Sequence, residues 1–353
     1  MSHPVFSLDS LPHPIVQAPM AGGPSTPALA AAVCEAGGLG MLAAGYRPPA
    51  AVAEEIATLR GLTQAPFGVN LFAPPGAPAD PAALTRFAGR LAAEAERQGA
   101  EVGTPRHDDD GWAEKLDVMA RAGVPVVSFT FGCPSAAFVA GLHDAGAAVW
   151  VTITTPEEAV IAADAGADAL VAQGVEAGGH RGSFDDARPG DLGLLALLQL
   201  AGAVVELPLV ATGGLATGRA VAAVLAAGAR AAQLGTVLMR TPEAATSPAQ
   251  RAALEGSAPT ALTRAFTGRT GRGIANRFMA EHGPAAPGGY PDVHHLTAPL
   301  RAAARARGDA EAFNLWAGQA YPLAPDEPAG DVVRRLAAEA RAALREAAAR
   351  VAS

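Results

Sequence analysis

Short apolar runs that alternate with alanine-rich stretches limit most strongly how this chain can fold. Each run ends in a small or polar residue and is followed by a stretch with helical spacing. The eight runs are 15–20, 39–44, 67–72, 125–130, 148–153, 169–173, 209–212 and 231–235. Continuous apolar strands separated by helices are typical of a parallel sheet that is covered on both faces. Eight such units in roughly 240 residues predict an α/β fold of the (β/α)8 TIM barrel type.

Helix boundary signals support this alternation. Thr26, Thr155 and Thr217 each precede an alanine-rich stretch, and Gly166 and Gly228 follow two of these stretches. A threonine hydroxyl can cap the first turn of a helix, and glycine commonly ends one. We therefore expect helices between the predicted strands.

Two segments depart from the repeat. Residues 74–110 form a longer excursion between the third and fourth strands, and residues 241–330 mix proline, glycine, histidine and short helices. We predict a barrel over 1–240, a mostly helical cap over the barrel mouth at 241–330, and a helix at 331–353 that packs back on the barrel. A solvated surface helix is the alternative for this last segment.

Composition excludes several classes of protein. The chain has a formal net charge of −8 and a single lysine, Lys115, which argues against nucleic acid or an anionic membrane as the main partner. No apolar run is long enough to cross a bilayer, and the first residues lack the features of a secretory leader, so we expect a cytoplasmic protein. The two cysteines, Cys34 and Cys133, cannot form a disulfide framework. Both could be small buried residues, although Cys133 follows a strand and could line a pocket.

Amide side chains stand at the ends of three predicted strands. Barrel enzymes place their active sites at the carboxyl ends of the strands. Asn70, Gln173 and Gln233 occupy such positions. Because an amide both donates and accepts hydrogen bonds, these residues suit the mixed edge of an isoalloxazine ring.

Small residues follow the seventh and eighth strands, where barrels commonly bind a phosphate. These residues are Gly213, Gly214, Gly235 and Thr236. A Gly-x-Gly-x-x-Gly fingerprint after a strand is absent from the sequence, so a Rossmann dinucleotide site is not expected.

His180 is the predicted catalytic residue. It follows the diglycine Gly178-Gly179 after the sixth strand, and this turn would let the backbone approach a flat ligand. Imidazole is the side chain best suited to exchange a proton near neutral pH. Glu176 could orient the imidazole or point into solvent, and Arg181 could attract an anionic substrate.

The remaining charged residues are less specific. Surface positions are expected for five histidines, namely His3, His13, His107, His143 and His282. His294 and His295 lack a third ligand at metal spacing, so no metal site is predicted. The basic cluster Arg264, Arg269, Arg272 and Arg277 could bind a phosphate or steer an anion, or could pair with surface carboxylates.

Seven motifs occur in an order that resembles one known family. They are QAPMAGG, FGVNLFAP, VSFTFG, QGVEAGGHRG, ATGGLA, QLGTVLM and TRAFTGRTGRGIANRF. This set resembles the bacterial class of nitronate monooxygenases, formerly called 2-nitropropane dioxygenases, over nearly the whole chain. The resemblance implies an FMN-containing barrel that oxidises alkyl nitronates with O2 to a carbonyl compound and nitrite. Propionate 3-nitronate is the substrate it suggests.

The resemblance also assigns roles to individual residues. Met20 would touch the flavin ring, and His180 matches the active-site histidine of the family. The positions that match flavin-binding residues are Asn70, Gln173, Gly178, Gly214, Gln233, Leu234, Gly235 and Thr236.

Other functions remain open at this stage. The barrel and the string Glu-Ala-Gly-Gly-His are also similar to the flavin-dependent enoyl-acyl carrier protein reductases and NAD(P)H:quinone reductases. Arg181 after His180 and the TRAFTGRTGRGIANRF block favour the nitronate enzymes. A flavin-binding protein without enzymatic activity is a third alternative, and both a monomer and a homodimer are compatible with the sequence.

Overall fold

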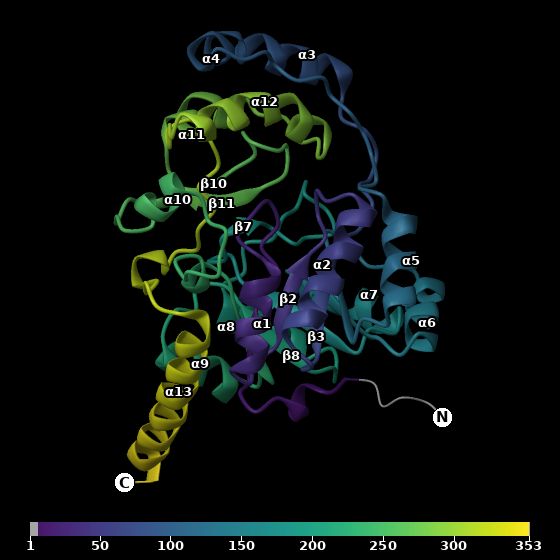
Figure 1. Cartoon of the computed structure of the whole chain (residues 1–353), viewed down its shortest axis with the longest axis vertical. Helices are drawn as coiled ribbons and strands as arrows, with labels where there is room; N and C mark the ends of the chain where they lie inside the picture. The colour runs from purple at the N-terminus through teal and green to yellow at the C-terminus, as the bar shows by residue number, and fades with distance from the viewer. Residues whose placement is uncertain (1–5, 353) are drawn as a thin grey trace.

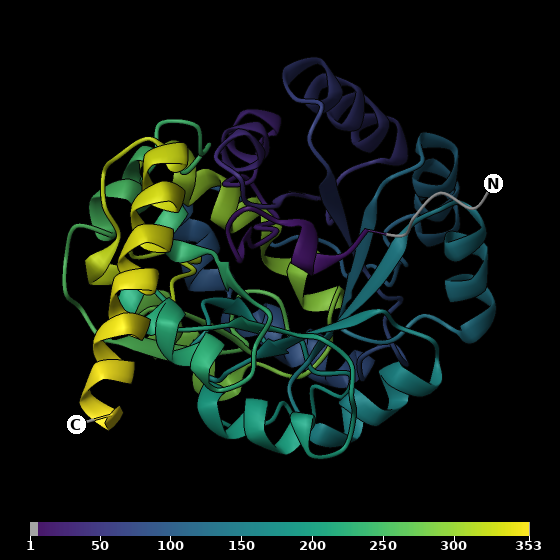
Figure 2. The same ribbon diagram turned by 90° about the horizontal axis from the view of Figure 1, so that it is seen from below.

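Eight parallel strands close into a barrel in the computed structural model, which describes residues 6–352 (Figures 1 and 2). The strands are β1 (Ile15–Gln17), β2 (Gly40–Ala43), β3 (Phe67–Phe72), β4 (Val126–Thr130), β5 (Ala148–Ile153), β6 (Ala169–Gln173), β8 (Leu209–Thr212) and β9 (Ala231–Leu234). Their order is β1-β9-β8-β6-β5-β4-β3-β2, and a parallel bridge from Val16 to Leu39 joins the two ends. The predicted (β/α)8 barrel is confirmed.

The amino end of the barrel is filled by apolar side chains. Trp150 on β5 and Val171 on β6 belong to a buried cluster of strand residues, against which Phe6, Leu8 and Leu11 pack. The Phe6 and Trp150 ring centroids lie 6.1 Å apart. The segment before β1, including the 3-10 helix η1 (Leu8–Ser10), therefore covers this end (Figure 2).

Helices surround the barrel, and three of them begin where the sequence predicted. The surrounding helices are α1 (Pro27–Glu35), α2 (Pro49–Leu62), α5 (Trp112–Ala122), α6 (Ala136–Asp144), α7 (Pro156–Asp164), α8 (Leu194–Gly202) and α9 (Gly218–Ala226). The hydroxyls of Thr26, Thr155 and Thr217 accept hydrogen bonds from the first turns of α1, α7 and α9. These bonds satisfy backbone N–H groups that have no partner within the helix.

A second layer covers the carboxyl ends of the strands (Figure 1). Its helices are α3 (Pro81–Arg90), α4 (Ala92–Gln98), α10 (Pro248–Ala253), α11 (Arg277–His282) and α12 (Asp292–Ala306), with the 3-10 helices η2 (Thr236–Leu238), η3 (Gly283–Ala285) and η4 (Tyr321–Leu323) nearby. Phe87 and Leu91 pack with Phe266, Phe278 and Leu296 in one buried cluster. The 74–110 excursion therefore contributes α3 and α4 to the cap.

A small antiparallel sheet connects the barrel to the cap. It contains β7 (Gly179–His180), β10 (Thr260–Thr263) and β11 (Gly271–Ile274), in the order β10-β11-β7. The chain from the end of β6 is thus fixed to the segment after α10.

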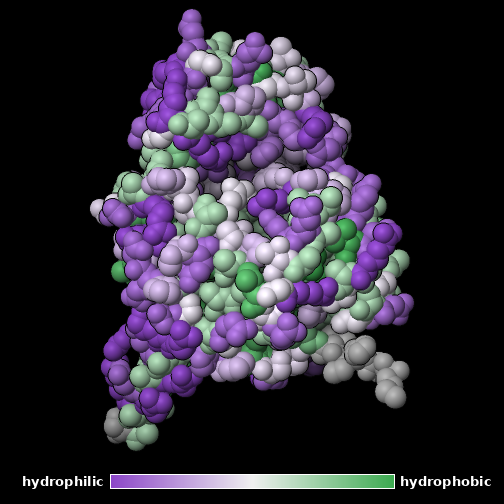
Figure 3. Space-filling model, viewed as in Figure 1, coloured by the Kyte–Doolittle hydropathy of each residue, from purple (hydrophilic) through white to green (hydrophobic). Residues whose placement is uncertain are grey.

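The closing helix α13 (Ala329–Ala352) packs on α9 and α1 through its first half. Val333, Leu336 and Ala340 are buried in the core, whereas Val351 is exposed. The outer surface of α13 is largely hydrophilic on the face shown in Figure 3. None of the described helices is both long and apolar enough to cross a membrane. The domain limits at 240 and 330 stay a prediction.

The contact of α13 with the barrel should contribute measurably to stability. Leu336 has no exposed surface, so Leu336→Ala removes buried methyl groups and leaves a cavity. We expect the free energy of unfolding to fall by about 2–5 kcal/mol, measured by urea denaturation. Val351→Ala is the control, because this side chain is 89% exposed and its loss should have little effect. Equal stability of the two variants would contradict the packing of α13 on the barrel.

Candidate functional site

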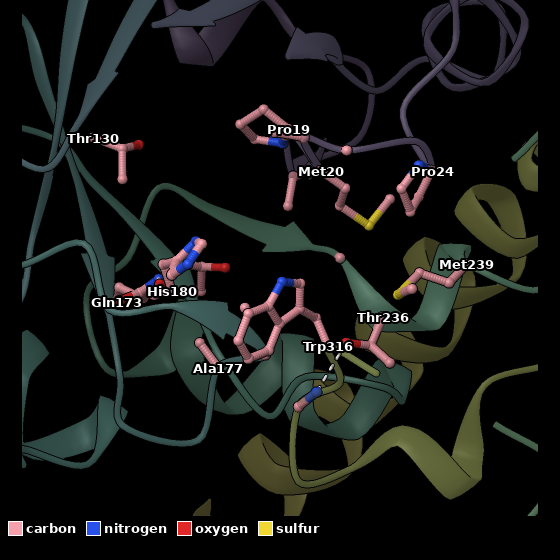
Figure 4. A pocket seen from close by; sticks show the side chains of 18 of the residues that line it. Pro19, Met20, Pro24, Thr130, Gln173, Ala177, His180, Thr236, Met239 and Trp316 are labelled. Atoms are coloured by element: carbon pink, nitrogen blue, oxygen red, sulfur yellow. Dashed lines mark hydrogen bonds between the residues drawn. The ribbon is translucent and has the colours of Figure 1, made fainter. Parts of the chain in front are cut away.

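A cavity of about 390 Å³ lies between the carboxyl ends of the barrel strands and the cap. Figure 4 shows Met20 on one side of the cavity and His180 and Trp316 on the other. The sequence-predicted residues that line it are Met20, Asn70, Gln173, Gly178, His180, Gly213, Gly214, Gln233, Gly235 and Thr236. Leu234 does not line it, because its side chain is fully buried in the core.

Two of the amides leave polar atoms available to a ligand. The Asn70 Nδ2 donates to Ser128 Oγ at 2.9 Å and Thr130 Oγ1 at 3.0 Å, while its Oδ1 has no donor among the described residues. The Gln233 side-chain amide, 8% exposed, has no hydrogen-bond partner in the described part of the chain. Because a buried amide normally has partners, the Gln233 amide fits a polar ligand in the cavity.

The third amide holds the chain in place. Gln173 Nε2 donates to the His180 carbonyl at 3.0 Å, and its Oε1 accepts from Gly182 N at 2.8 Å and Arg181 Nη1 at 3.0 Å. The Arg181 guanidinium also donates to the carbonyl oxygen of Gly174 at 2.7 Å. Arg181 is 1% exposed and lies outside the cavity lining. The expectation that Arg181 attracts an anionic substrate is wrong, because backbone and amide oxygens enclose its charge.

Glu176 has neither of its two expected roles. Both carboxylate oxygens accept from the Leu194 N–H at 3.1 Å, at the first residue of α8. A carboxylate is favourable at a helix N-terminus, so Glu176 stabilises the start of α8. It does not orient the His180 imidazole.

His180 lies on β7 and not at the end of β6. It is opposite Gly271 of β11, and Gln173, the last residue of β6, reaches it through an amide hydrogen bond. The ring Nε2 is 2.8 Å from Thr267 Oγ1, and this hydroxyl donates to the Arg269 carbonyl at 3.3 Å. If the hydroxyl donates to that carbonyl, Nε2 donates to Oγ1 and Nδ1 carries the free lone pair. Nδ1 has no partner among the described residues.

The surroundings of His180 keep its ring neutral. Its ring centroid lies 5.1 Å from that of Trp316, 5.7 Å from Phe131 and 6.0 Å from Tyr290. Burial, followed by the charges of Arg269 and Arg301, lowers the pKa of His180 to about 3. The imidazole is therefore uncharged at neutral pH, and its unprotonated nitrogen can accept a hydrogen bond.

The turns after β8 and β9 leave backbone donors unused. Gly213 and Gly214 have φ values of +118° and +69°, conformations that favour glycine. The N–H groups of Gly213, Gly214 and Gly235 have no acceptor among residues 6–352. Thr236 Oγ1 accepts from the Gly318 N–H at 3.0 Å (Figure 4). Free N–H groups on adjacent turns fit an anion such as a phosphate.

The cap adds cavity residues that sequence reasoning missed. They are Thr267, His294, Arg301, Arg305, Asn314 and Trp316, and the barrel loop after β2 adds Tyr46. The His294 ring stacks on Tyr46 at 4.4 Å, and burial with the nearby Arg301 charge lowers the pKa of His294 to about 2. Positions 294, 301 and 305 share one face of α12, and that helical spacing was the available signal.

The basic cluster does not reach the cavity. Arg264 pairs with Asp186 at 2.8 Å, and Arg277 pairs with Glu94 at 2.7 Å. Arg269 stacks over the Phe131 ring at 4.0 Å and donates to backbone carbonyls, as Arg272 does to the carbonyl of Val175. None of the four arginines lines the cavity. Pairing within the protein, and not phosphate binding, accounts for them.

Several smaller predictions have mixed outcomes. His282 is 7% exposed and packs on Phe278, so its predicted surface position is wrong. His3 lies outside the described residues. Cys34 is buried, and Cys133 is half-buried outside the cavity lining. Among the described residues, one group has metal-ligand spacing, Glu94, Glu281 and His282, but Arg97 and Arg277 occupy its carboxylates.

Comparisons with known proteins agree on one family. A family model described as nitronate monooxygenase matches residues 7–339. A nitronate monooxygenase from Pseudomonas aeruginosa is 43% identical over 93% of this chain and 96% of that protein. One from Paraburkholderia phytofirmans is 40% identical over 97% of this chain and 95% of that protein.

Two solved structures are similar to this one over nearly the whole chain. A nitroalkane oxidase from Streptomyces ansochromogenes is similar with a TM-score of 0.93 and 52% identity, over 96% of this chain and 99% of that chain. FabK from Thermotoga maritima is similar with a TM-score of 0.74 and 26% identity, over 97% of each chain.

Replacing Gly214 should test the anion-binding turn. A valine there would adopt an unfavourable positive φ, and its Cβ would lie 3.0 Å from the Glu176 Cβ beside the cavity. We expect Gly214→Val to purify without the flavin that the sequence resemblance implies, measured by absorbance after denaturation. Gly228→Val is the matched control, since Gly228 also has a positive φ, +99°, but lies away from the cavity. Full flavin content in Gly214→Val would argue against this turn as part of the site.

Proposed function

The chain belongs to the nitronate monooxygenase family of flavin-dependent oxidoreductases, and from this we propose that its cofactor is FMN and its substrates are alkyl nitronates. Propionate 3-nitronate is the substrate we expect to react best. The products are a carbonyl compound and nitrite, with O2 as the oxidant. The observation that carries the proposal is the single cavity that gathers the unpaired Gln233 amide, the free N–H groups after β8 and β9, and a neutral His180.

The residues present fit FMN. Asn70 and Gln233 offer an acceptor and an amide to the ring edge, and Met20 would contact the ring. The N–H groups of Gly213, Gly214 and Gly235 would hold the phosphate. When bound, FMN supplies the electron acceptor for the substrate and passes electrons on to O2.

His180 has two roles toward substrate in this proposal. With a preformed nitronate, the neutral imidazole positions the anion by hydrogen bonding and no proton is removed. With a neutral nitroalkane, Nδ1 accepts the α-proton as a general base. Thr267 holds the ring at Nε2, and the surrounding rings of Phe131 and Trp316 exclude water.

The alternative function is that of a reductase, because the structure is also similar to that of FabK. We expect the flavin to be reduced rapidly by an alkyl nitronate and slowly or not at all by NADH or NADPH. The reason is the absence of a dinucleotide fingerprint from the sequence. The measurement is anaerobic mixing of the purified protein with each donor while the flavin absorbance is followed. Nitrite release in air is the positive counterpart, and rapid stoichiometric reduction by NADH would favour the reductase.

His180→Asn should separate the two roles of the histidine. We expect a loss on the order of 10²-fold or more with neutral nitroalkanes, the usual contribution of a positioned general base, and a smaller loss with preformed nitronates. FMN content should be unchanged. His143→Asn is the control, because His143 pairs with Asp168 away from the cavity.

The pH profile gives a second measurement on the same variant. A general base acts in its deprotonated form, and a pKa of about 3 keeps His180 deprotonated as the pH falls from 8 to 5. The turnover of nitroalkanes by the wild-type protein should therefore not fall with an apparent pKa near 6.5. His180→Asn should leave the shape of the profile between pH 8 and 5 unchanged. Equal losses on nitroalkanes and nitronates would mean that the histidine binds the anion only. Full activity on both would contradict its assignment.

A further inference from the structure

Two arginines of α12 line the cavity without a carboxylate partner. Arg301 is 5% exposed. Its Nε donates to Thr297 Oγ1 at 3.0 Å, and its Nη1 donates to Asn314 Oδ1 at 3.2 Å. Its Nη2 donates to His294 Nδ1 at 3.2 Å and to the His294 carbonyl at 3.0 Å. Arg305, one turn later and exposed, donates from Nη2 to the same Asn314 oxygen at 2.6 Å. Every one of these acceptors is neutral.

This arrangement differs from that of Arg264 and Arg277. Arg181, Arg269 and Arg272 also donate to neutral oxygens, but they lie outside the cavity lining. Arg264 and Arg277 each bind a carboxylate directly, and for Arg269 burial lowers the pKa while the charge of the nearby Asp186 opposes that shift. For Arg301, burial and the neighbouring charge of Arg305 lower the pKa to about 10, and no carboxylate opposes them. A buried charge without an opposite charge is costly, so such a pair is typical of a site whose anion arrives with a ligand.

The pair also has N–H groups to offer. A guanidinium carries five N–H donors, and the hydrogen bonds of Arg301 use four of them. Arg305 uses one of its own within the described part of the chain. Both residues line the cavity, so the remaining donors can meet a planar, two-oxygen anion there.

The pair lies on the His180 side of the cavity. The Tyr290 ring is 6.0 Å from that of His180 and 6.4 Å from that of His294, and His294 contacts Arg301. The charge of Arg301 also contributes to the low pKa of His180. By contrast, the free N–H groups of Gly213 and Gly214 come from the barrel turn after β8. The cap therefore supplies an anion site separate from the one expected for the flavin phosphate.

We infer that Arg301 and Arg305 bind a carboxylate at the end of the substrate remote from the reacting carbon. The inference rests on the proposed function, in which the nitronate itself lies against His180. The two arginines then select short nitronates that carry a second anionic group over nitronates with an uncharged chain. Arg301 forms the buried part of this subsite and Arg305 the part nearer solvent.

Paired substrates test this specificity. Propionate 3-nitronate and propyl-1-nitronate have the same number of carbons and differ in the terminal carboxylate. We expect Arg301→Gln to reduce the preference for propionate 3-nitronate, the ratio of the two kcat/KM values, roughly tenfold or more, mainly through KM. Arg305→Gln should reduce it less, and Arg301→Lys should restore part of it. Arg307→Gln is the control, because Arg307 follows the last residue of α12 and donates to the Arg97 carbonyl and the Gln98 side chain away from the cavity.

A binding measurement does not depend on turnover. Succinate carries two carboxylates, and butyrate has the same chain length with one. We expect succinate to shift the flavin absorbance of the wild-type holoenzyme at lower concentration than butyrate does, and this difference should disappear in Arg301→Gln. If the protein oxidised no nitronate, this titration would still report the anion subsite, so the two proposals can fail separately.

Three outcomes would overturn the inference. A loss in Arg301→Gln that is equal for both nitronates would mean that the arginine supports the cavity as a whole. Loss of FMN with an unchanged substrate preference would assign the pair to the phosphate. If Arg301→Gln does not fold, the same substrates are compared in Arg305→Gln, because Arg305 is exposed. An unchanged preference for propionate 3-nitronate in that variant would contradict the carboxylate subsite.

Discussion

The buried guanidinium of Arg181 is the contact on which the site depends. It binds the end of β6 through the amide of Gln173 and the carbonyl of Gly174, and so fixes the turn that leads to β7. β7 in turn pairs with β11, which ties His180 to the cap. Because the carbonyl oxygens of Gln173, Gly174 and Pro189 all accept from this guanidinium, loss of the side chain would release the turn as a unit.

The barrel could be predicted from the sequence nearly to the residue, because its signals are local. An apolar run, a threonine cap and a helix-ending glycine follow one another in the units of α1, α7 and α9, and Thr155 shows this well. The place of His180 could not be predicted, since its strand exists only through pairing with Gly271. Charge alone also misled, because Arg181 was expected to meet a ligand but is enclosed. Arg301 and Arg305 line the cavity, and only their helical spacing marked them in the sequence.

Barrel and cap contribute different chemistry to one cavity. The strand ends supply amides and free N–H groups, which suit a flat cofactor with a phosphate. The cap supplies the aromatic rings around His180 and the cationic face of α12. Substitutions on α12 are therefore expected to change which substrate is preferred without altering the barrel residues proposed to hold the cofactor.

The cap is assembled from two parts of the chain that are far apart in sequence. Phe87 and Leu91 belong to α3 and its C-terminal boundary, and they pack against Phe266 and Leu296, which follow all eight barrel strands. During synthesis these apolar side chains leave the ribosome long before their partners exist. The early half of the cap must stay exposed until the rest of the barrel has been made, so this segment is where a nascent chain would need protection from aggregation.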